Sequence, residues 1–457
     1  MENRKVAAPL DPSFAPIYRG LRAFEERAQS LGGPRIRIAL ERNDGLTAVR
    51  DLRILPDGAD DALNVRMVER MVKSMLWVYG GFRVTIAGSR AVYEGVKAQY
   101  REGGARAFDA QFMAHVYEHA FEVCYAETPD QAPERKEAAA PLGRHLDGCR
   151  IGFDAGGSDR KVSAVVNGES VYSEEVVWFP KTTSDPAYHF DGIVSAMKTA
   201  ASKMPRVDAI GVSSAGIYIN NRTMNASLFL KVGPEDYEKY VKDIYIRAAR
   251  EIGDVPLTVC NDGDVTALAG AMSLGEDGIL GIAMGTSEAG GYVDPNGNIT
   301  GWLNELAFVP CDLAPTAMVD EWSGDIGCGV KYFSQDAVIK LAPAAGIALD
   351  ADMSPAEKLK VVQAKMAEGH QGARAIYETI GVYLGYTLAF YAMFYDINHV
   401  LLMGRVTSGQ GGDLVLGKAQ EVLRAEYPEL KMQVNLPDEK SRRVGQSVAA
   451  ASLPAIG

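Results

Sequence analysis

Two aspartates, Asp154 and Asp262, each stand where an apolar run typical of a buried strand gives way to a turn. Such positions suit ligand binding, because α/β sheets form their clefts at the carboxyl ends of their strands. One carboxylate there could accept a proton from a substrate hydroxyl, and another could hold hydrated Mg²⁺ between phosphoryl oxygens. The simpler interpretation is that Asp262 or Asp264 only caps the helix that begins in "VTALAGAM".

Two strand–turn–strand segments flank Asp262 in the sequence, "IGFDAGGSDRKVSAVV" and "GILGIAMGTSEAGGYV". Glycine turns expose backbone N–H groups that bind phosphate, and a hydroxyl adds a further donor. A plain hairpin explains either segment alone about as well, but two in one chain favour a polyphosphate site. Neither segment has the P-loop or the G-x-G-x-x-G pattern. The predicted phosphate-binding residues are Gly156, Gly157, Ser158, Gly285 and Thr286.

A third glycine-rich turn follows the predicted strand "HVLLMG" and leads into the predicted helix "DLVLGKAQEVLRAEY". Bare backbone at Gly404, beside Arg405, could admit a flat purine and its ribose. A loop that only caps the following helix is an equally good interpretation of this segment taken alone.

The elements that must position these residues belong to two regions with different sequence patterns. Residues 149–457 alternate β-rich runs with amphipathic helices, which predicts α/β layers, whereas residues 1–148 read as a separate α+β module. A linker rich in Pro, Ala and charge is predicted near residues 127–147. Within the module we expect strands at 36–40, 47–55 and 82–88, and helices at 61–81, 89–101 and 108–126.

Composition excludes several classes of protein. The chain has 457 residues, 47% of them apolar, so wholesale disorder is excluded. Its net charge of −12 disfavours nucleic acid as a partner, because phosphate contacts need clustered cations. Five widely spaced cysteines without a C-x-x-C pattern indicate a reducing compartment. No secretory leader or membrane span is expected, so the predicted location is the cytoplasm.

Taken together, the motifs resemble the ROK family (repressors, open reading frames, kinases) of sugar kinases within the actin-like superfamily. The resemblance covers residues 150–457 and rests on the order and spacing of the segments that carry it. It implies two actin-like (ribonuclease-H-like) lobes with an ATP cleft, placed at 149–262 and 263–457, and leaves open that the last helix returns to the first lobe. The matching segments are "DAGGSDRK", "AIGVSSAGIY", "NDGDVTALAG", "AMGTSEAGGYV" and "FYDINHVLLMGRV".

The resemblance also implies roles for single residues. Asp262 would be the catalytic base, and Asp154 would assist Mg²⁺ through water. Asn261, Glu305 and, in a looser alignment, Asn225 would bind sugar hydroxyls. The cofactors implied are ATP and Mg²⁺. The glycine turns described above would hold the ATP phosphates, and Gly404 with Arg405 would flank the nucleoside.

Departures from the family pattern concern the sugar site. "NELAF" keeps Glu305 but has Phe308 where a His that binds zinc and sugar is expected. "SGDIGCGVKYFS" keeps Cys328 but has Val330 at a second sugar-binding Glu. We therefore expect no structural zinc, since one thiolate cannot supply four ligands. Glu288, inside the second phosphate segment, is unexpected because a carboxylate there would repel phosphate.

These observations predict an ATP- and Mg²⁺-dependent carbohydrate kinase acting on a sugar, or on a modified or deoxy sugar. The alternative is a regulatory protein that keeps the fold and binds a sugar or nucleotide without turnover. An ATPase without a small acceptor is a third reading. Regulation through DNA is disfavoured because residues 1–148 show no basic recognition helix. A homodimer is compatible with the sequence, and the acceptor sugar and the role of residues 1–148 stay open.

Overall fold

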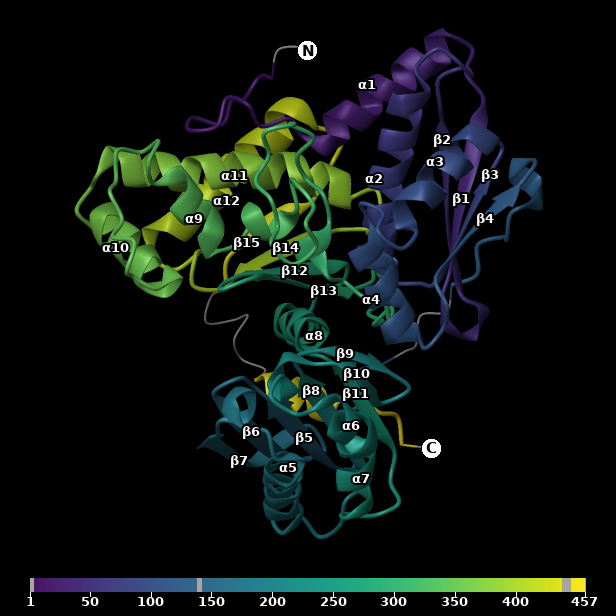
Figure 1. The fold of residues 1–457 in the computed structure, drawn as a ribbon. Coiled ribbons are helices and arrows are strands. Elements are labelled where there is room, and N and C mark those ends of the chain that lie inside the picture. The colour runs from purple at the N-terminus through teal and green to yellow at the C-terminus, as the bar shows by residue number, and fades with distance from the viewer. Residues whose placement is uncertain (1–3, 138–141, 438–444, 457) are drawn as a thin grey trace. The chain divides into compact units, whose positions relative to one another are not determined.

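The computed structural model describes residues 4–137, 142–437 and 445–456 of the chain (Figure 1). The chain forms two compact units, which we describe one at a time. Unit 1 comprises Met1–Ala138, Ile282–Gly290 and Trp302–Leu436, and unit 2 comprises Ala139–Gly281, Gly291–Gly301 and Pro437–Gly457. Among the described residues, no helix has both the length and the apolar character needed to cross a membrane.

Unit 2 contains a five-stranded sheet in the order β11-β8-β5-β6-β7. β5, β8 and β11 run parallel, whereas β6 and β7 complete the sheet in antiparallel fashion. The strands of unit 2 are β5 (Cys149–Ala155), β6 (Asp159–Val166), β7 (Glu169–Val177), β8 (Ala209–Ser214), β9 (Ile217–Ile219), β10 (Arg222–Asn225) and β11 (Leu257–Asn261). Of these, β9 and β10 form a separate two-stranded sheet. The helices of unit 2 are α5 (Pro186–Ala201), α6 (Pro234–Asp236), α7 (Ile244–Arg250), α8 (Asp262–Leu274) and α13 (Gln446–Ala451), with helical turns η3 (Pro180–Thr182), η4 (Ser227–Phe229) and η5 (Tyr237–Val241).

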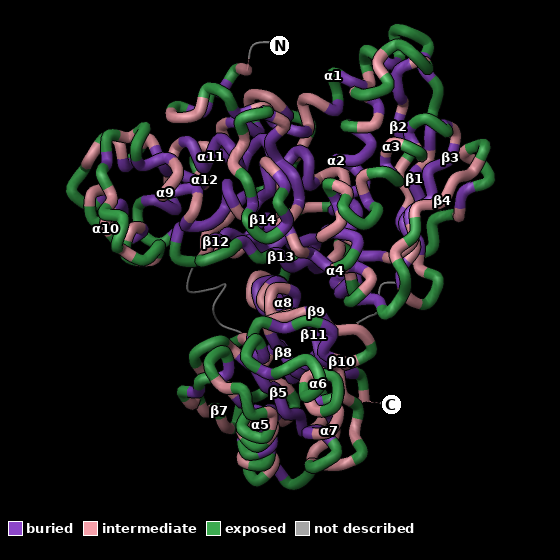
Figure 2. The backbone as a smooth tube through the Cα atoms, in the orientation of Figure 1, coloured by how far each residue is buried: buried purple, intermediate pink, exposed green. Residues whose placement is uncertain are grey.

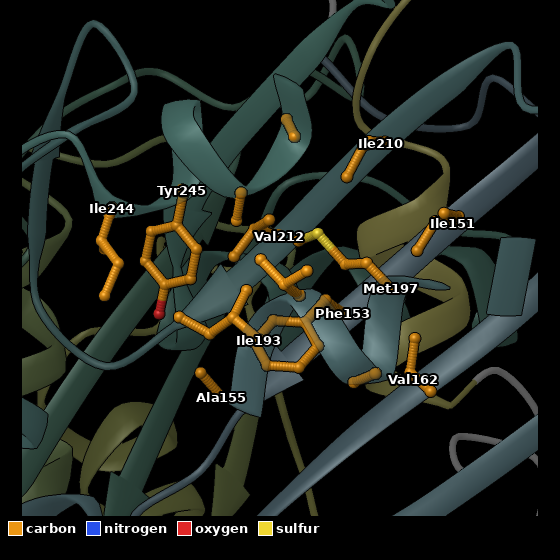
Figure 3. Packing of buried hydrophobic residues seen from close by; sticks show 14 of the residues in the cluster. Ile151, Phe153, Ala155, Val162, Ile193, Met197, Ile210, Val212, Ile244 and Tyr245 are labelled. Atoms are coloured by element: carbon orange, nitrogen blue, oxygen red, sulfur yellow. The ribbon is translucent and has the colours of Figure 1, made fainter. Parts of the chain in front are cut away.

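The sheet of unit 2 is covered on both faces, which is why β5 is buried along its whole length. On one face Phe153 packs with Ile193 and Met197 of α5 and with Tyr245 of α7 (Figure 3). On the other face α13 approaches so closely that a side chain at Gly152 would overlap the carbonyl of Ser447. This packing fixes the strands whose ends carry the candidate site.

The N-terminal part of unit 1 is built on a four-stranded sheet in the order β2-β1-β3-β4. Helix α2 is buried over most of its length (Figure 2), and the side chain of Asp60 caps its first turn by accepting from the Leu63 N–H. The elements are α1 (Ile17–Ser30), β1 (Arg35–Glu41), η1 (Asn43–Gly45), β2 (Thr47–Arg53), α2 (Asp61–Tyr79), β3 (Arg83–Ala87), α3 (Arg90–Tyr100), α4 (Ala107–Tyr117), β4 (Glu122–Ala126) and η2 (Pro129–Gln131).

The predicted helix over residues 108–126 is wrong in its second half. Helix α4 ends at Tyr117 because Glu118 takes a left-handed conformation, with φ of 54°. The chain then turns, His119 stacks on Phe82, and residues from Glu122 onward pair with β3 as a strand. A continuous apolar pattern hid this break, since β-strands and buried helices share such patterns over short lengths.

The remainder of unit 1 surrounds helix α11, which is buried from Ile376 to Tyr391 apart from Glu378 and packs along α12. It also contains most of the four-stranded sheet β13-β12-β14-β15. The hairpin of β12 and β13 is divided between the units: Ile282–Gly290 belong to unit 1, and the residues before and after them belong to unit 2. The elements are β12 (Ile279–Met284), β13 (Glu288–Val293), η6 (Leu306–Phe308), η7 (Gly329–Lys331), α9 (Gln335–Leu341), α10 (Pro355–Ala367), α11 (Gln371–Tyr391), β14 (His399–Met403), α12 (Gln410–Glu426) and β15 (Gln433–Asn435).

The first part of the predicted linker is ordered against the N-terminal sheet. Thr47 and Lys136 exchange two backbone hydrogen bonds of 2.7 and 3.0 Å. Glu137 accepts two bonds from the buried guanidinium of Arg42. Residues 138–141 of the predicted linker lie outside the described residues.

Candidate functional site

The carboxyl ends of three parallel strands bring the predicted carboxylates of unit 2 together. Asp154 of β5 lies opposite Ser213 of β8, which in turn lies opposite Cys260 of β11, and Asp262 follows two residues later. The Ser213 hydroxyl donates to Asp154 Oδ1 at 2.9 Å. The side-chain amide of Gln446, which leads into α13, donates to Ser213 Oγ at 2.9 Å and to the Asp262 carbonyl at 3.1 Å.

Burial is the main influence on the pKa values of the two carboxyl groups at this edge. Burial raises the pKa of Asp154 to about 6, the hydrogen bond from Ser213 works against this rise, and the charge of Asp262 adds to it. Burial likewise raises the pKa of Asp262, while backbone hydrogen bonds and the charge of Lys181 lower it. The charges of Lys161 and Lys181 lower these two pKa values without outweighing burial, as expected for a site that binds a cation with its ligand.

At the start of helix α8, the capping and packing contacts come from the neighbours of Asp262. Asn261 is the N-cap, since its Oδ1 accepts from the Gly263 N–H at 2.7 Å and its Nδ2 donates to the Gly216 carbonyl at 2.8 Å. Asp264 is 4% exposed and accepts from the Tyr292 N–H at 3.0 Å, which ties α8 to β13. The Asp262 carboxylate accepts from the Gly263 N–H at 3.1 Å, and a hydrogen bond from its own backbone also lowers its pKa. Asn261 and Asp264 thus supply the contacts that hold the start of the helix.

The turn between β5 and β6 carries the first predicted phosphate-binding residues. Trp178 fixes this turn by donating from Nε1 to the Gly156 carbonyl at 2.8 Å. The Ser158 hydroxyl donates to Asp159 at 3.0 Å. Lys181 crosses the turn, so that a Cβ built on Gly157 would lie 3.0 Å from its Nζ. An ammonium group therefore lies directly beside the turn.

Asn225 ends strand β10 and is exposed. Its backbone carbonyl packs against Gly216, the residue that accepts the hydrogen bond from Asn261. The two predicted sugar-binding asparagines of unit 2 are therefore linked through one backbone segment.

In unit 1 the two predicted nucleotide turns pack on each other. Gly404 has φ of 97°, and a side chain there would overlap the backbone of Met284, the residue before Gly285. The Val406 N–H donates to the Met284 carbonyl at 3.0 Å, which holds the segment of Gly404 and Arg405 beside the turn of Gly285 and Thr286. By contrast, a Cβ on Gly285 would meet only one atom, at 3.8 Å, so neither packing nor strain requires glycine there. Close approach of a ligand is one reason for a glycine at such a place.

Glu288 does not face the phosphate turn as a charge. It is 3% exposed, and Tyr391 donates to its Oε1 at 3.3 Å. Burial raises the pKa of Glu288 to about 8, so the side chain is mainly neutral at pH 7. The repulsion expected from the sequence is thereby avoided.

Glu305 precedes η6 and is partly exposed. Its backbone N–H donates to the carbonyl of Trp77 in helix α2, at 2.9 Å. Phe308, at the position of the expected histidine, stacks on the Trp77 ring with centroids 4.1 Å apart. The carboxyl end of helix α2 thus contacts this segment twice, at the backbone of Glu305 and at the ring of Phe308.

The predicted residues are divided between the two units. Unit 2 contains Asp154, Gly156, Gly157, Ser158, Asn225, Asn261 and Asp262, and unit 1 contains Gly285, Thr286, Glu305, Gly404 and Arg405. Sequence reasoning missed Ser213, Gln446 and Lys181. Ser213 lies in the "AIGVSSAGIY" segment, so its strand-end position was a usable signal, whereas neither Gln446 nor Lys181 sits in a recognisable motif.

Solved structures share this fold. The ROK hexokinase of Thermus thermophilus matches with a TM-score of 0.52 at 18% identity, over 67% of this chain and 97% of that chain. A ROK family glucokinase from Streptomyces griseus, solved with glucose and AMPPNP, matches with a TM-score of 0.47 at 21% identity, over 66% and 98%. A ROK family transcriptional regulator, a homolog of the E. coli MLC protein, matches with a TM-score of 0.49 at 17% identity, over 67% and 79%. No family model and no curated protein sequence matches the chain.

The match to the hexokinase shows that about two thirds of this chain shares the α/β fold of that ROK sugar kinase, which confirms the fold class predicted from the motifs. At this identity the likeness concerns the fold and not the activity. What the site does must therefore be argued from its residues.

The donor set of unit 2 suits a hydrated divalent cation. The charge of Asp262 adds to the raised pKa of Asp154 at this strand edge, and a hard cation relieves such repulsion through oxygen ligands and water. Within residues 4–137, 142–437 and 445–456, no group of three or more His, Cys, Asp or Glu side chains is arranged to hold a metal ion by itself.

Proposed function

We propose that the protein is an ATP- and Mg²⁺-dependent sugar kinase in which Asp262 is the general base. The observation that carries this proposal is the buried carboxylate pair at the carboxyl ends of β5 and β11, where Asn261 and Asp264 hold helix α8 and leave Asp262 for chemistry. Bound ATP with Mg²⁺ would supply the transferable phosphoryl group.

Asp262 would accept the proton of the attacking sugar hydroxyl. Burial makes its ionised form a stronger base than an exposed carboxylate, and the neighbouring Lys181 helps to keep it ionised. Asp154, held by Ser213, would orient the cation through water.

Backbone N–H groups and nearby cations would bind the phosphates. In unit 2 the candidates are the turn of Gly156, Gly157 and Ser158 and the ammonium of Lys181. In unit 1 they are Gly285 and Thr286, with Gly404 and Arg405 at the nucleoside. Local N–H groups and Mg²⁺ must provide this affinity, because the net charge of −12 gives no general attraction for phosphate.

Glu305, with Asn261 and Asn225, would bind the acceptor. Phe308 is committed to a stack with Trp77, so it offers an apolar surface where a polar contact was expected. A modified or deoxy sugar fits this arrangement better than one that needs a hydrogen bond at that place, since a buried hydroxyl without a partner is costly.

The direct test is ATP turnover by the full-length protein over a panel of hexoses, N-acetylhexosamines and deoxy sugars. We expect ADP release that depends on one class of sugar and on Mg²⁺. Hydrolysis of ATP at the same rate without any sugar would identify an ATPase and contradict the proposal.

The packing of Phe308 also favours a second candidate, a sensor that binds a sugar or nucleotide without turning it over. A thermal-shift screen over the same panel separates the two. A sensor would be stabilised by its ligand and would release no ADP.

A further inference from the structure

Unit 1 contains a buried group of charges that no step of the proposed reaction uses. Helix α2 contributes Arg70 and Lys73, and the residue before α4 contributes Arg106. All three cations contact Asp325, a residue of the segment between η6 and η7. The distances are 2.8 Å from Arg70, 2.8 Å from Lys73 and 2.6 Å from Arg106.

Burying these charges costs free energy unless each has a partner, so the group requires its particular partners to be in place. Lys73 is 0% exposed and Asp325 is 2% exposed. Burial raises the pKa of Asp325, but the three cations outweigh burial and hold it well below its usual range. Removing one partner leaves an uncompensated buried charge, so the N-terminal module is locked to the segment that carries Asp325.

Helix α2 holds the neighbouring segment by its carboxyl end as well. The last carbonyl groups of a helix have no partner within the helix. Here the carbonyls of Trp77 and Val78 accept from the N–H groups of Glu305 and Asn304, at 2.9 and 3.0 Å. The backbone of Glu305 therefore completes the end of α2.

An aromatic cluster reinforces this attachment. The Trp77 ring stacks on Phe308 and also contacts Phe108 and Phe112 of α4. Its Nε1 donates to Asp109 at 2.6 Å, which fixes the ring plane. The three residues after Glu305 thus lie against the N-terminal module.

Backbone hydrogen bonds join the two attachment points. Cys311 donates to the Gly327 carbonyl at 2.8 Å, and Gly329 donates to the Val309 carbonyl at 2.9 Å. The N-terminal module holds both Asp325 and residues 304–308, and these hydrogen bonds join the two. The contacts therefore fix the segment of residues 304–329.

We propose that the N-terminal module is a built-in clamp that positions Glu305 for the acceptor, with Lys73 and Trp77 as positioning residues. This inference rests on the proposed function for the acceptor, while the clamp itself can be tested without any substrate. It gives the N-terminal module a role in the reaction through the placement of Glu305.

Kinetics test the positioning role. Trp77→Ala and Lys73→Met should each raise the KM for the sugar about tenfold or more, because a small misplacement of a binding group is costly, and should leave the KM for ATP within about twofold. Trp77→Phe keeps a stacking ring and should recover most of the sugar affinity. The matched control is Val96→Ala on α3, which shortens a fully buried side chain of the same module.

Hydrogen exchange tests the clamp in the protein without ligand, so it gives a result even if a variant is inactive. In Trp77→Ala and Lys73→Met the peptides that cover residues 302–313 should exchange at least about tenfold faster, while α11 stays protected. Unchanged exchange there, or equal loosening by Val96→Ala, would overturn the clamp.

The two proposals fail differently. Faster exchange in the variants, together with a wild type that binds and phosphorylates no sugar, would keep the clamp and remove the kinase. Sugar turnover with an unaltered KM in both variants would keep the kinase and remove the positioning role.

Discussion

Asp154 in unit 2 and Asp325 in unit 1 are both buried carboxylates, and they end in opposite electrostatic states. Asp154 meets a hydroxyl and a second carboxylate, and burial together with that neighbour raises its pKa to about 6. Asp325 meets three cations, which overcome burial and hold its pKa well below the usual range.

The difference separates a structural anchor from a ligand site. Asp325 is paired with three cations of the same unit, as expected for a group that holds the chain together. The charges of Lys161 and Lys181 offset burial of Asp154 and Asp262 less completely, so an incoming cation or proton can still change the energy of this pair. Carboxylates of one residue type thus differ in role through the partners that the fold supplies.

The largest effect should come from Asp262→Asn. If the less compensated pair is the reactive one, kcat should fall by about 10³- to 10⁴-fold, because the proton acceptor is lost while the shape is kept. The comparison is with Asp243→Asn, an exposed carboxylate of the same unit that pairs with Arg222. Full activity of the Asp262 variant on the true sugar would remove the assigned base.

Asp325→Asn should cost the most stability, about 3–5 kcal/mol in the free energy of unfolding, because three buried cations each lose a carboxylate partner and keep those of Glu69 and Asp109. Urea unfolding of the variant beside Asp51→Asn measures this, since Asp51 pairs with Arg37 at the surface. The wild type should lose this contribution only as the pH falls below the ordinary range of a carboxyl group, because its folded pKa is lowered. A loss below about 1 kcal/mol would show that the cluster is no anchor.

Glu288 is another buried carboxyl group, and within the described part of the chain its pKa is governed by burial and the hydrogen bond from Tyr391, without an ion pair. Its raised pKa, about 8, means that the folded state keeps a proton that the unfolded state releases, so stability should fall as the pH rises from about 4.5 to 8. Glu288→Gln removes this penalty and should stabilise the protein by about 1–3 kcal/mol at pH 8 but little at pH 4.5. Unfolding midpoints at both pH values decide this, and an equal shift at both would contradict a buried neutral carboxyl.

The smallest effect should follow from Lys181→Met. Loss of the ammonium beside the turn of Gly157 should raise the KM for ATP about three- to tenfold, and less at high salt, because the contact is exposed. Lys203→Met, in the same unit but beside Tyr172, is the control and should change nothing. If the KM for ATP does not move, Lys181 has no part in phosphate binding.

Much of the fold could be read from the sequence because its signals are local. The pattern of 61–81 predicted α2, and the order of glycine turns and strand ends predicted the edge that carries Asp154 and Asp262. The break at Glu118 was missed, because one left-handed residue interrupts a pattern that otherwise continues. Lys181 was missed because an exposed lysine has no distinctive local pattern.

The sequence by itself determined the motifs, their order and the residue types needed for phosphoryl transfer, since each of these depends on neighbours in the chain. Only the tertiary structure decided which charges are compensated. Arg70 and Asp325 are 255 residues apart, and no local pattern pairs them. The direction of Glu288 into the core and the division of labour among Asn261, Asp262 and Asp264 were likewise set by packing, because burial and hydrogen-bond partners exist only in the folded chain.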